Sequence, residues 1–171
     1  REPVPGRTRS GPGAGQLFGA FQGTYNHSGL FQELPAQQGE LWQAAVWGRN
    51  RPDDPLQGDN RVRLKIEFLD DAGTILLANP LSVLTAASSR DYQPLAVRGR
   101  APAGTSRARM AVEFVQPDYA PGSVLLDDAE VGVLTAAGPD RSLLDGGFEA
   151  GLGGEFAAWV PYGPGSLQNI M

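Results

Sequence analysis

Two stretches of strict alternation constrain the fold of this chain more than any other feature. In residues 61–70, RVRLKIEFLD, apolar side chains alternate with charged ones, and residues 107–115, RARMAVEFV, repeat the pattern. A period of two places the apolar side chains on one face of a β-strand and the charged ones on the other. We therefore expect two strands, each with one face in the core and one in water. The residues predicted to point inward are Val62, Leu64, Ile66, Phe68, Ala108, Met110, Val112 and Phe114.

Further strand candidates recur along the chain at intervals of about 8–12 residues, which is the spacing of short strands joined by turns. They are residues 15–21, 28–34, 41–48, 92–99 and 123–134. Turn-forming residues crowd the segments between them, and no segment keeps a helical period over three turns. The spacing predicts an all-β fold, either a sandwich or a barrel of antiparallel strands.

The composition excludes several classes of function. The 171-residue chain has no cysteine and one histidine, His27, which excludes thiol catalysis, thiolate metal sites and most catalytic triads. A net charge of −5 argues against nucleic-acid binding, and no run approaches the roughly 20 apolar residues of a membrane helix. The paired carboxylates at 53–54 and 70–71 lie in turn sequences, whereas a glycosidase needs two carboxylates across a cleft. We therefore expect a protein that is not an enzyme.

Several segments, taken in order, resemble the galactose-binding-like jelly-roll domains of the carbohydrate-binding-module type. They are SGLFQELPAQQGELW at 28–42, GDNRVRLKIEFLDDAG at 58–73, APAGTSRARMAVEFV at 101–115 and GSVLLDDAEV at 122–131. The match covers about residues 7–134, and it rests on order and spacing more than on any single motif. The resemblance implies an antiparallel β-sandwich of the jelly-roll type.

The strand that opens such a domain stands at the other end of this chain. Domains of this type begin with a GFE…W…G strand followed by an RSG-containing one; here the second part lies at 7–21 and the first at 143–163. A sandwich without its first strand exposes unpaired backbone groups and bare core. We therefore expect the C-terminal segment to fill such a vacancy. Its aromatic residues, the predicted interface, are Phe148, Phe156, Trp159 and Tyr162.

Two closures, and a third interpretation without closure, are compatible with this order. In the favoured one, the segment enters a neighbouring copy, a head-to-tail contact that builds a filament. The segment could instead fold back into its own domain, or the chain could be one piece of a longer repeat protein. The favoured closure divides the chain into an N-terminal arm (1–14), a jelly-roll sandwich (15–134), a linker (135–142) and a donor strand (143–171).

The resemblance also implies a structural calcium ion near the first strand. The pattern carries over to Glu149, Asp127 and Asp128, with backbone carbonyls near residues 9–11 completing the shell. Calcium binds six to eight oxygen ligands and would offset the repulsion between clustered carboxylates. The alternative is that the aspartate pair forms a turn at a strand end and that Glu149 is solvated.

Sugar binding is the other candidate chemistry, because it needs exposed aromatic rings and hydrogen-bonding groups in a groove. Trp47 is out of phase with Trp42, so we expect Trp47 and Gln43 on an outer face, and we expect Tyr92 in or near a loop. These three residues are the candidate glycan contacts. The alternative is structural, since Trp42 and Trp159 suit the core and single exposed aromatic residues are common.

The sequence thus predicts a non-catalytic structural subunit, extracellular or at the cell surface. We expect it to assemble with other copies of itself into a fibre or surface array by β-strand complementation. The alternative function is a carbohydrate-binding accessory module of a larger secreted enzyme or adhesin, with a polysaccharide as partner. Neither function involves nucleic acid or insertion into a membrane.

Overall fold

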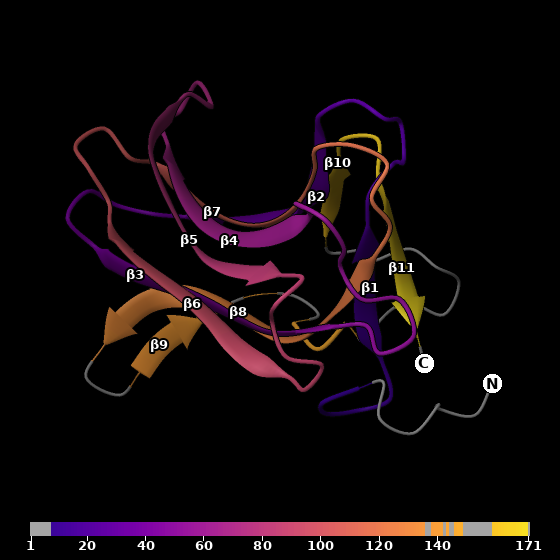
Figure 1. The fold of residues 1–171 in the computed structure, drawn as a ribbon. Helices are drawn as coiled ribbons and strands as arrows, with labels where there is room; N and C mark the ends of the chain where they lie inside the picture. The colour runs from indigo at the N-terminus through magenta and orange to yellow at the C-terminus, as the bar shows by residue number, and fades with distance from the viewer. Residues whose placement is uncertain (1–7, 136–137, 142, 144–145, 149–158, 171) are drawn as a thin grey trace.

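The fold is taken from a computed structural model, which describes residues 8–135, 138–141, 143, 146–148 and 159–170. Within these residues, eleven β-strands form two antiparallel sheets that face each other (Figure 1). Figure 1 also shows that one sheet is bowed, with its hollow side turned away from the other sheet. No segment among the described residues forms a helix that could cross a membrane.

The strands divide between two sheets, here called sheet A and sheet B. Sheet A contains β1 (Ala14–Phe18), β3 (Leu41–Asn50), β6 (Gln93–Arg100), β8 (Ser123–Thr135), β9 (Gly138–Arg141) and β11 (Ser166–Ile170). Sheet B contains β2 (Asn26–Pro35), β4 (Arg61–Leu69), β5 (Ile75–Thr85), β7 (Arg107–Gln116) and β10 (Val160–Tyr162). The spatial order is β11-β1-β8-β3-β6 in sheet A, with β9 paired to β8, and β10-β2-β7-β4-β5 in sheet B.

The first eight strands have the connectivity of a jelly roll. They lie in the orders β1-β8-β3-β6 and β2-β7-β4-β5, and the chain changes sheet at every connection except the β4–β5 hairpin. Two four-stranded sheets joined in this way form the eight-stranded double Greek key that defines the fold. The all-β, antiparallel jelly-roll sandwich predicted from the sequence is confirmed.

The core lies between the sheets and is built by the alternation seen in the sequence. All eight residues predicted to point inward from 61–70 and 107–115 are at most 2% exposed. Trp42 and Trp159 are also buried, which agrees with the prediction that they belong to the core. Strand β5 was not anticipated, because its apolar residues do not alternate with polar ones. Several of its large apolar side chains are exposed, among them Ile75, Leu76, Leu77 and Val83.

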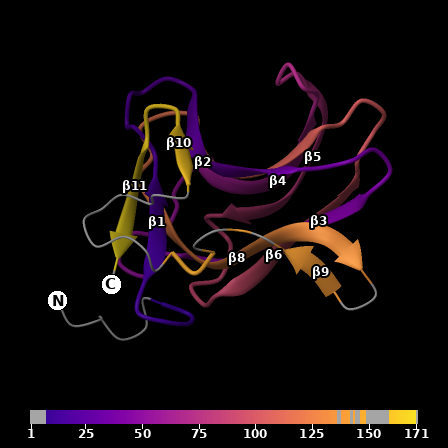
Figure 2. The ribbon, with the colours of Figure 1, turned by 180° about the vertical axis from the view of Figure 1, so that it is seen from behind.

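The C-terminal segment closes one end of its own sandwich. Strand β11 pairs with β1, with Ile170 opposite Ala14, and β10 pairs with β2, with Val160 opposite Phe31. Figures 1 and 2 show β10 and β11 beside β2 and β1 from both sides. The short connection between them crosses from sheet B to sheet A, so two consecutive strands extend the two sheets.

Two aromatic residues of this segment complete the core. Phe148 and Trp159 are buried and stack on each other, with ring centroids 5.2 Å apart and planes 16° from parallel. The structure therefore shows the self-closing alternative within the single chain, while donation to a neighbouring copy stays a prediction. Phe156 lies outside the described residues. Residues 138–141, within the predicted linker, form β9 and pair with β8.

Candidate functional site on the outer face of sheet B

A pocket of about 350 Å³ lies on the outer face of sheet B, the face turned away from sheet A. Its lining comes from β2, β4, β7 and β10, at positions that alternate with core residues and therefore share one side of the sheet. The lining residues are His27, Phe31, Lys65, Glu67, Arg109, Ala111, Glu113 and Tyr162. The charged half of the alternation in 61–70 and 107–115 thus faces a pocket.

Small residues make room for this pocket. Ala111 lies between Phe31 of β2 and Lys65 of β4, and Gly29 lies opposite Tyr162 of β10. A Cβ atom at Gly29 would overlap a backbone carbonyl oxygen of β7 and lie 3.0 Å from the Tyr162 ring. Glycine therefore lets the tyrosine ring lie directly against the sheet.

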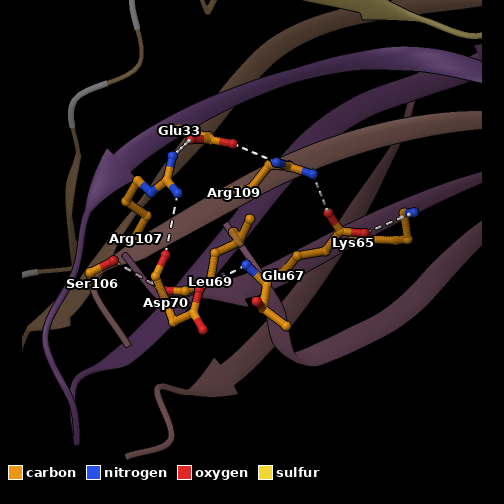
Figure 3. Close-up of polar contacts among 9 residues, drawn as sticks. Glu33, Lys65, Glu67, Leu69, Asp70, Ser106, Arg107 and Arg109 are labelled. Atoms are coloured by element: carbon orange, nitrogen blue, oxygen red, sulfur yellow. Dashed lines mark hydrogen bonds and ion pairs between the residues drawn. The ribbon is translucent and has the colours of Figure 1, made fainter. Parts of the chain in front are cut away.

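Charged side chains form an unbroken chain of ion pairs across β2, β7 and β4. Cations and carboxylates alternate along it with N···O distances of 2.6–3.4 Å, and each carboxylate lies between two cations. The order is Arg107, Glu33, Arg109, Glu67, Lys65, Glu113 and Arg63. Figure 3 shows Arg109 between Glu33 and Glu67. Shared partners of this kind hold long side chains in fixed positions.

Two aromatic rings border the chain of ion pairs on the β10 side. Phe31 and Tyr162 have ring centroids 6.1 Å apart, and the Arg109 guanidinium lies 4.5 Å from the centre of the Phe31 ring. The Tyr162 hydroxyl is buried and has no hydrogen-bond partner among the described residues. Burial, followed by the charges of Glu113 and Glu67, raises the pKa of Tyr162 above its ordinary value. The hydroxyl therefore stays protonated and can donate a hydrogen bond.

Trp47, predicted as a glycan contact, lies on the outer face of sheet A, opposite in direction to the buried Trp42. That orientation confirms the out-of-phase argument. The ring is already covered by a cation, because the Arg9 guanidinium lies 3.8 Å from its centre. Stacking of a sugar on the same ring face would first have to displace Arg9.

Of the other two predicted glycan contacts, Gln43 lies in β3 of the same sheet and Tyr92 directly precedes β6, and both have arginine neighbours. The Gln43 side-chain oxygen accepts a hydrogen bond of 2.7 Å from Arg98, and the Arg49 guanidinium lies 4.7 Å from the centre of the Tyr92 ring. Burial, followed by the charge of Asp127, raises the pKa of Tyr92. Their role as glycan contacts stays a prediction.

The predicted metal ligands Asp127 and Asp128 hold the N-terminal segment against β8. Asp127 is fully buried, and its Oδ2 accepts hydrogen bonds from the backbone N–H groups of Arg9 at 2.7 Å and Ser10 at 3.1 Å. Asp128 accepts a hydrogen bond of 2.5 Å from the Ser10 hydroxyl and forms an ion pair with Arg9. Glu149, the third predicted ligand, lies outside the described residues.

The described residues around this pair do not by themselves make a calcium shell. Calcium requires six or more oxygens, whereas here an arginine cation lies against Asp128 and backbone N–H groups occupy Asp127. Among the described residues, no group of three or more acidic or histidine side chains is close enough to hold a metal. Calcium binding stays a prediction that needs Arg9 to move and Glu149 to join the site.

A β-bulge explains why two consecutive aspartates reach the same segment. Trp47 lies opposite Asp127 and Ala45 opposite Glu130, so β8 has one more residue than β3 in this interval. Asp128 occupies the left-handed backbone region, with φ 48°. In a regular strand the two side chains would point to opposite faces, and the bulge redirects the second one.

Sequence reasoning did not single out the pocket on sheet B, although a signal for it was present. The outward positions of 61–70 carry Arg63, Lys65 and Glu67, while those of 107–115 carry Arg109 and Glu113. Opposite charges on the same face of adjacent strands form pairs, but the sequence alone does not show that β4 and β7 are adjacent. Tyr162 was identified from sequence as an interface aromatic, and the structure places it in the pocket wall.

Comparison with known proteins gives likenesses of fold only. No protein-family model and no curated protein sequence matches the chain. Among solved structures, the enzymatically active domain of bacteriophage CBA120 tailspike protein 4 is 16% identical, with a TM-score of 0.49 over 63% of this chain. A structure described as CBM4 is 15% identical, with a TM-score of 0.40 over 59%.

A third likeness is to the CBM22-1–GH10 modules of a Clostridium thermocellum endo-1,4-β-D-xylanase 10B, complexed with xylohexaose. It is 10% identical, with a TM-score of 0.42 over 59% of this chain. The matched region corresponds to 14%, 57% and 18% of the tailspike, CBM4 and xylanase chains, respectively. The chain therefore spans less than two thirds of the length of each of these three chains.

Proposed function

We propose that this protein is a carbohydrate-binding module that takes a polysaccharide on the outer face of sheet B. One observation carries the proposal: a buried tyrosine hydroxyl with no partner among the described residues lies in the wall of a pocket, next to an aromatic ring. A buried hydroxyl that folding leaves unpaired costs free energy, which a ligand that accepts its hydrogen bond would recover.

The chemistry of the pocket suits a sugar. A sugar ring has an apolar side that packs on aromatic rings and hydroxyl groups that both donate and accept hydrogen bonds. Phe31 and Tyr162 supply the rings, while Glu67 and Glu113 supply acceptors and Arg109 a donor. A volume of about 350 Å³ is at the lower end of the usual range for ligand pockets, so it suits a short stretch of sugar units.

The same geometry favours binding over catalysis. A glycosidase places two carboxylates on opposite sides of the scissile bond, one of them as a proton donor. In this pocket Glu67 and Glu113 both contact the same cation, Lys65, at 3.1 and 3.4 Å. The carboxylates are therefore neighbours in one ion-pair chain, and we assign them a ligand-holding role. A non-catalytic module of this kind would act as an accessory part of a larger secreted or surface protein.

The fibre function expected from the sequence would need β10 and β11 to leave their own sandwich. In the chain described here, β10 and β11 are paired within the molecule, and Trp159 and Phe148 are buried. The geometry therefore supports the binding module better, and assembly stays a prediction. Light scattering tests it: a monomer with exchange-protected amides in β10 and β11 would contradict assembly by strand donation.

Two variants and one control test the binding proposal. We expect the protein to be retarded by at least one polysaccharide in affinity gel electrophoresis. Tyr162→Phe removes only the hydroxyl and should weaken that binding by roughly threefold to tenfold, which is the value of one hydrogen bond. Phe31→Ala should weaken it further, because it removes ring surface from the same wall.

The matched control is Trp47→Ala, which removes an aromatic ring from the outer face of sheet A. We expect it to leave retardation unchanged. Loss of binding in Trp47→Ala with full binding in Tyr162→Phe would place the site on sheet A, as the sequence predicted. Absence of retardation by every polysaccharide tested would overturn the proposed function.

A further inference from the structure

The outer face of sheet B has a net positive charge, whereas the molecule as a whole has a net negative charge. The chain has a net charge of −5, yet the described outward positions of β2, β4 and β7 carry five cations and three carboxylates. The cations are Arg61, Arg63, Lys65, Arg107 and Arg109, and the carboxylates are Glu33, Glu67 and Glu113. A face with a net positive charge on an acidic protein creates a local field that attracts negatively charged ligands.

The arrangement of these charges is as informative as their number. The chain of ion pairs begins and ends with an arginine, so each carboxylate is shared by two cations while the terminal arginines contact one carboxylate each. The terminal side chains of Arg63 and Arg107 are 28% and 36% exposed, whereas the carboxylates Glu33, Glu67 and Glu113 are 22%, 8% and 5% exposed. A ligand approaching this face therefore meets the two terminal arginines first.

We infer that the polysaccharide bound on this face is an anionic one that carries carboxylate groups on its sugar units. This rests on the proposed function, because it names the ligand class of the same site. An arginine guanidinium presents a planar fork that matches a carboxylate, and Arg63 and Arg107 flank the pocket on either side along the strands. The pocket between them holds the sugar ring, and the Tyr162 hydroxyl donates to an oxygen of that ring unit.

The central comparison is between two forms of one polymer, with its carboxylates free or esterified. Polygalacturonate is run beside the same backbone with its carboxylates methyl-esterified, and beside neutral xylan and dextran sulfate, in affinity gel electrophoresis at 50 mM and 500 mM NaCl. We expect polygalacturonate to bind at low salt and the esterified polymer to bind at least tenfold more weakly. High salt should weaken the binding of polygalacturonate and leave the binding of the esterified polymer unchanged.

Variants at the two ends of the ion-pair chain make the test specific to this face. Arg63→Gln and Arg107→Gln should each weaken polygalacturonate binding by roughly threefold to fivefold, as expected for an exposed charge contact. Arg98→Gln, on the outer face of sheet A, is the matched control and should leave binding unchanged. Thermal unfolding of each variant shows whether the fold is retained, and the wild-type salt series tests the inference without any variant.

The outcomes separate this inference from the proposed function. Equal, salt-independent binding of the esterified polymer or of xylan, with loss in Tyr162→Phe, would overturn the anionic ligand and leave the binding module standing. Binding of dextran sulfate without polygalacturonate would overturn the carboxylate assignment. Absence of binding to every polymer would overturn both.

Discussion

The two outer faces of this sandwich use their polar side chains in different ways. On sheet A, the buried Asp127 accepts backbone N–H groups of the N-terminal segment, and the Trp47 ring is covered by Arg9. On sheet B, seven charged side chains form ion pairs with neighbours on the same sheet face, and the Tyr162 hydroxyl is left without a partner among the described residues. The first face binds part of its own chain, while the second keeps a pocket.

This difference teaches that residue type alone does not locate a binding face. The tryptophan and glutamine that suggested a sugar site are on the face whose groups already have arginine neighbours. The charged strands that suggested only a solvated surface are on the face with the pocket. What distinguishes the two is whether the hydrogen-bonding capacity of buried groups is already used.

The largest expected effect comes from the aromatic stack that closes the sandwich beside sheet B. Trp159→Ala removes a fully packed ring from the core and should lower the free energy of unfolding by about 3–5 kcal/mol, measured by urea denaturation. It should also abolish polysaccharide binding, because β10, which carries Tyr162, begins at the next residue. Trp47→Ala, on the other face, should cost less than about 1 kcal/mol. Equal losses in the two variants would contradict the self-closed core.

A smaller effect is expected where sheet A binds the N-terminal segment. Asp127→Ala leaves the backbone N–H groups of Arg9 and Ser10 without their acceptor and should lower the free energy of unfolding by about 1–3 kcal/mol. Polysaccharide binding should be unchanged, because Asp127 lies on the opposite sheet. A loss of binding in this variant would show that the two faces are not independent.

The pH dependence of stability should also separate the faces. Burial raises the pKa of Asp127, so the folded state holds this proton more tightly than the unfolded state does. The stabilising contribution is therefore complete below the ordinary aspartate pKa and declines as pH rises through the higher folded value. Asp127→Asn should flatten this decline, as measured by urea denaturation between about pH 3 and pH 7. An unaltered pH profile would show that another group causes it.

The smallest effect concerns how the aspartate pair is neutralised. Arg9→Gln removes an exposed ion pair and the contact with the Trp47 ring, and should lower the free energy of unfolding by about 1 kcal/mol or less. The calcium prediction is tested in the same experiment by adding calcium or a chelator during thermal unfolding. A rise in Tm with calcium that disappears in Asp128→Asn would support an ion that takes the place of Arg9.

Most of the fold could be predicted from the sequence, because alternation in 61–70 and 107–115 directly reports which side of a strand is buried. Strand β5 could not be predicted, since its apolar residues do not alternate with polar ones. The resemblance indicated that the C-terminal segment takes the place of the missing first strand, but sequence order does not say whether it does so in its own chain or in another copy.

The site was harder to predict for a physical reason. Its chain of ion pairs joins Glu33 of β2 to Arg109 of β7 and then to Lys65 of β4, across long separations in sequence. Such pairs become visible only when strand order and register are known. The bulge at Asp128 was equally hidden, because an extra residue in one strand is defined only by its partner.

The pairing of Ala14 with Ile170 has a practical consequence for engineering. Partners across an antiparallel pair lie about 5 Å apart, so the first and last strands leave the sandwich at one corner. A short linker between them, with new ends opened in the exposed turn at 71–73, should yield a circular permutant that keeps the pocket on sheet B intact. The same corner would let the whole unit be grafted into a surface loop of a host protein with little disturbance to either partner.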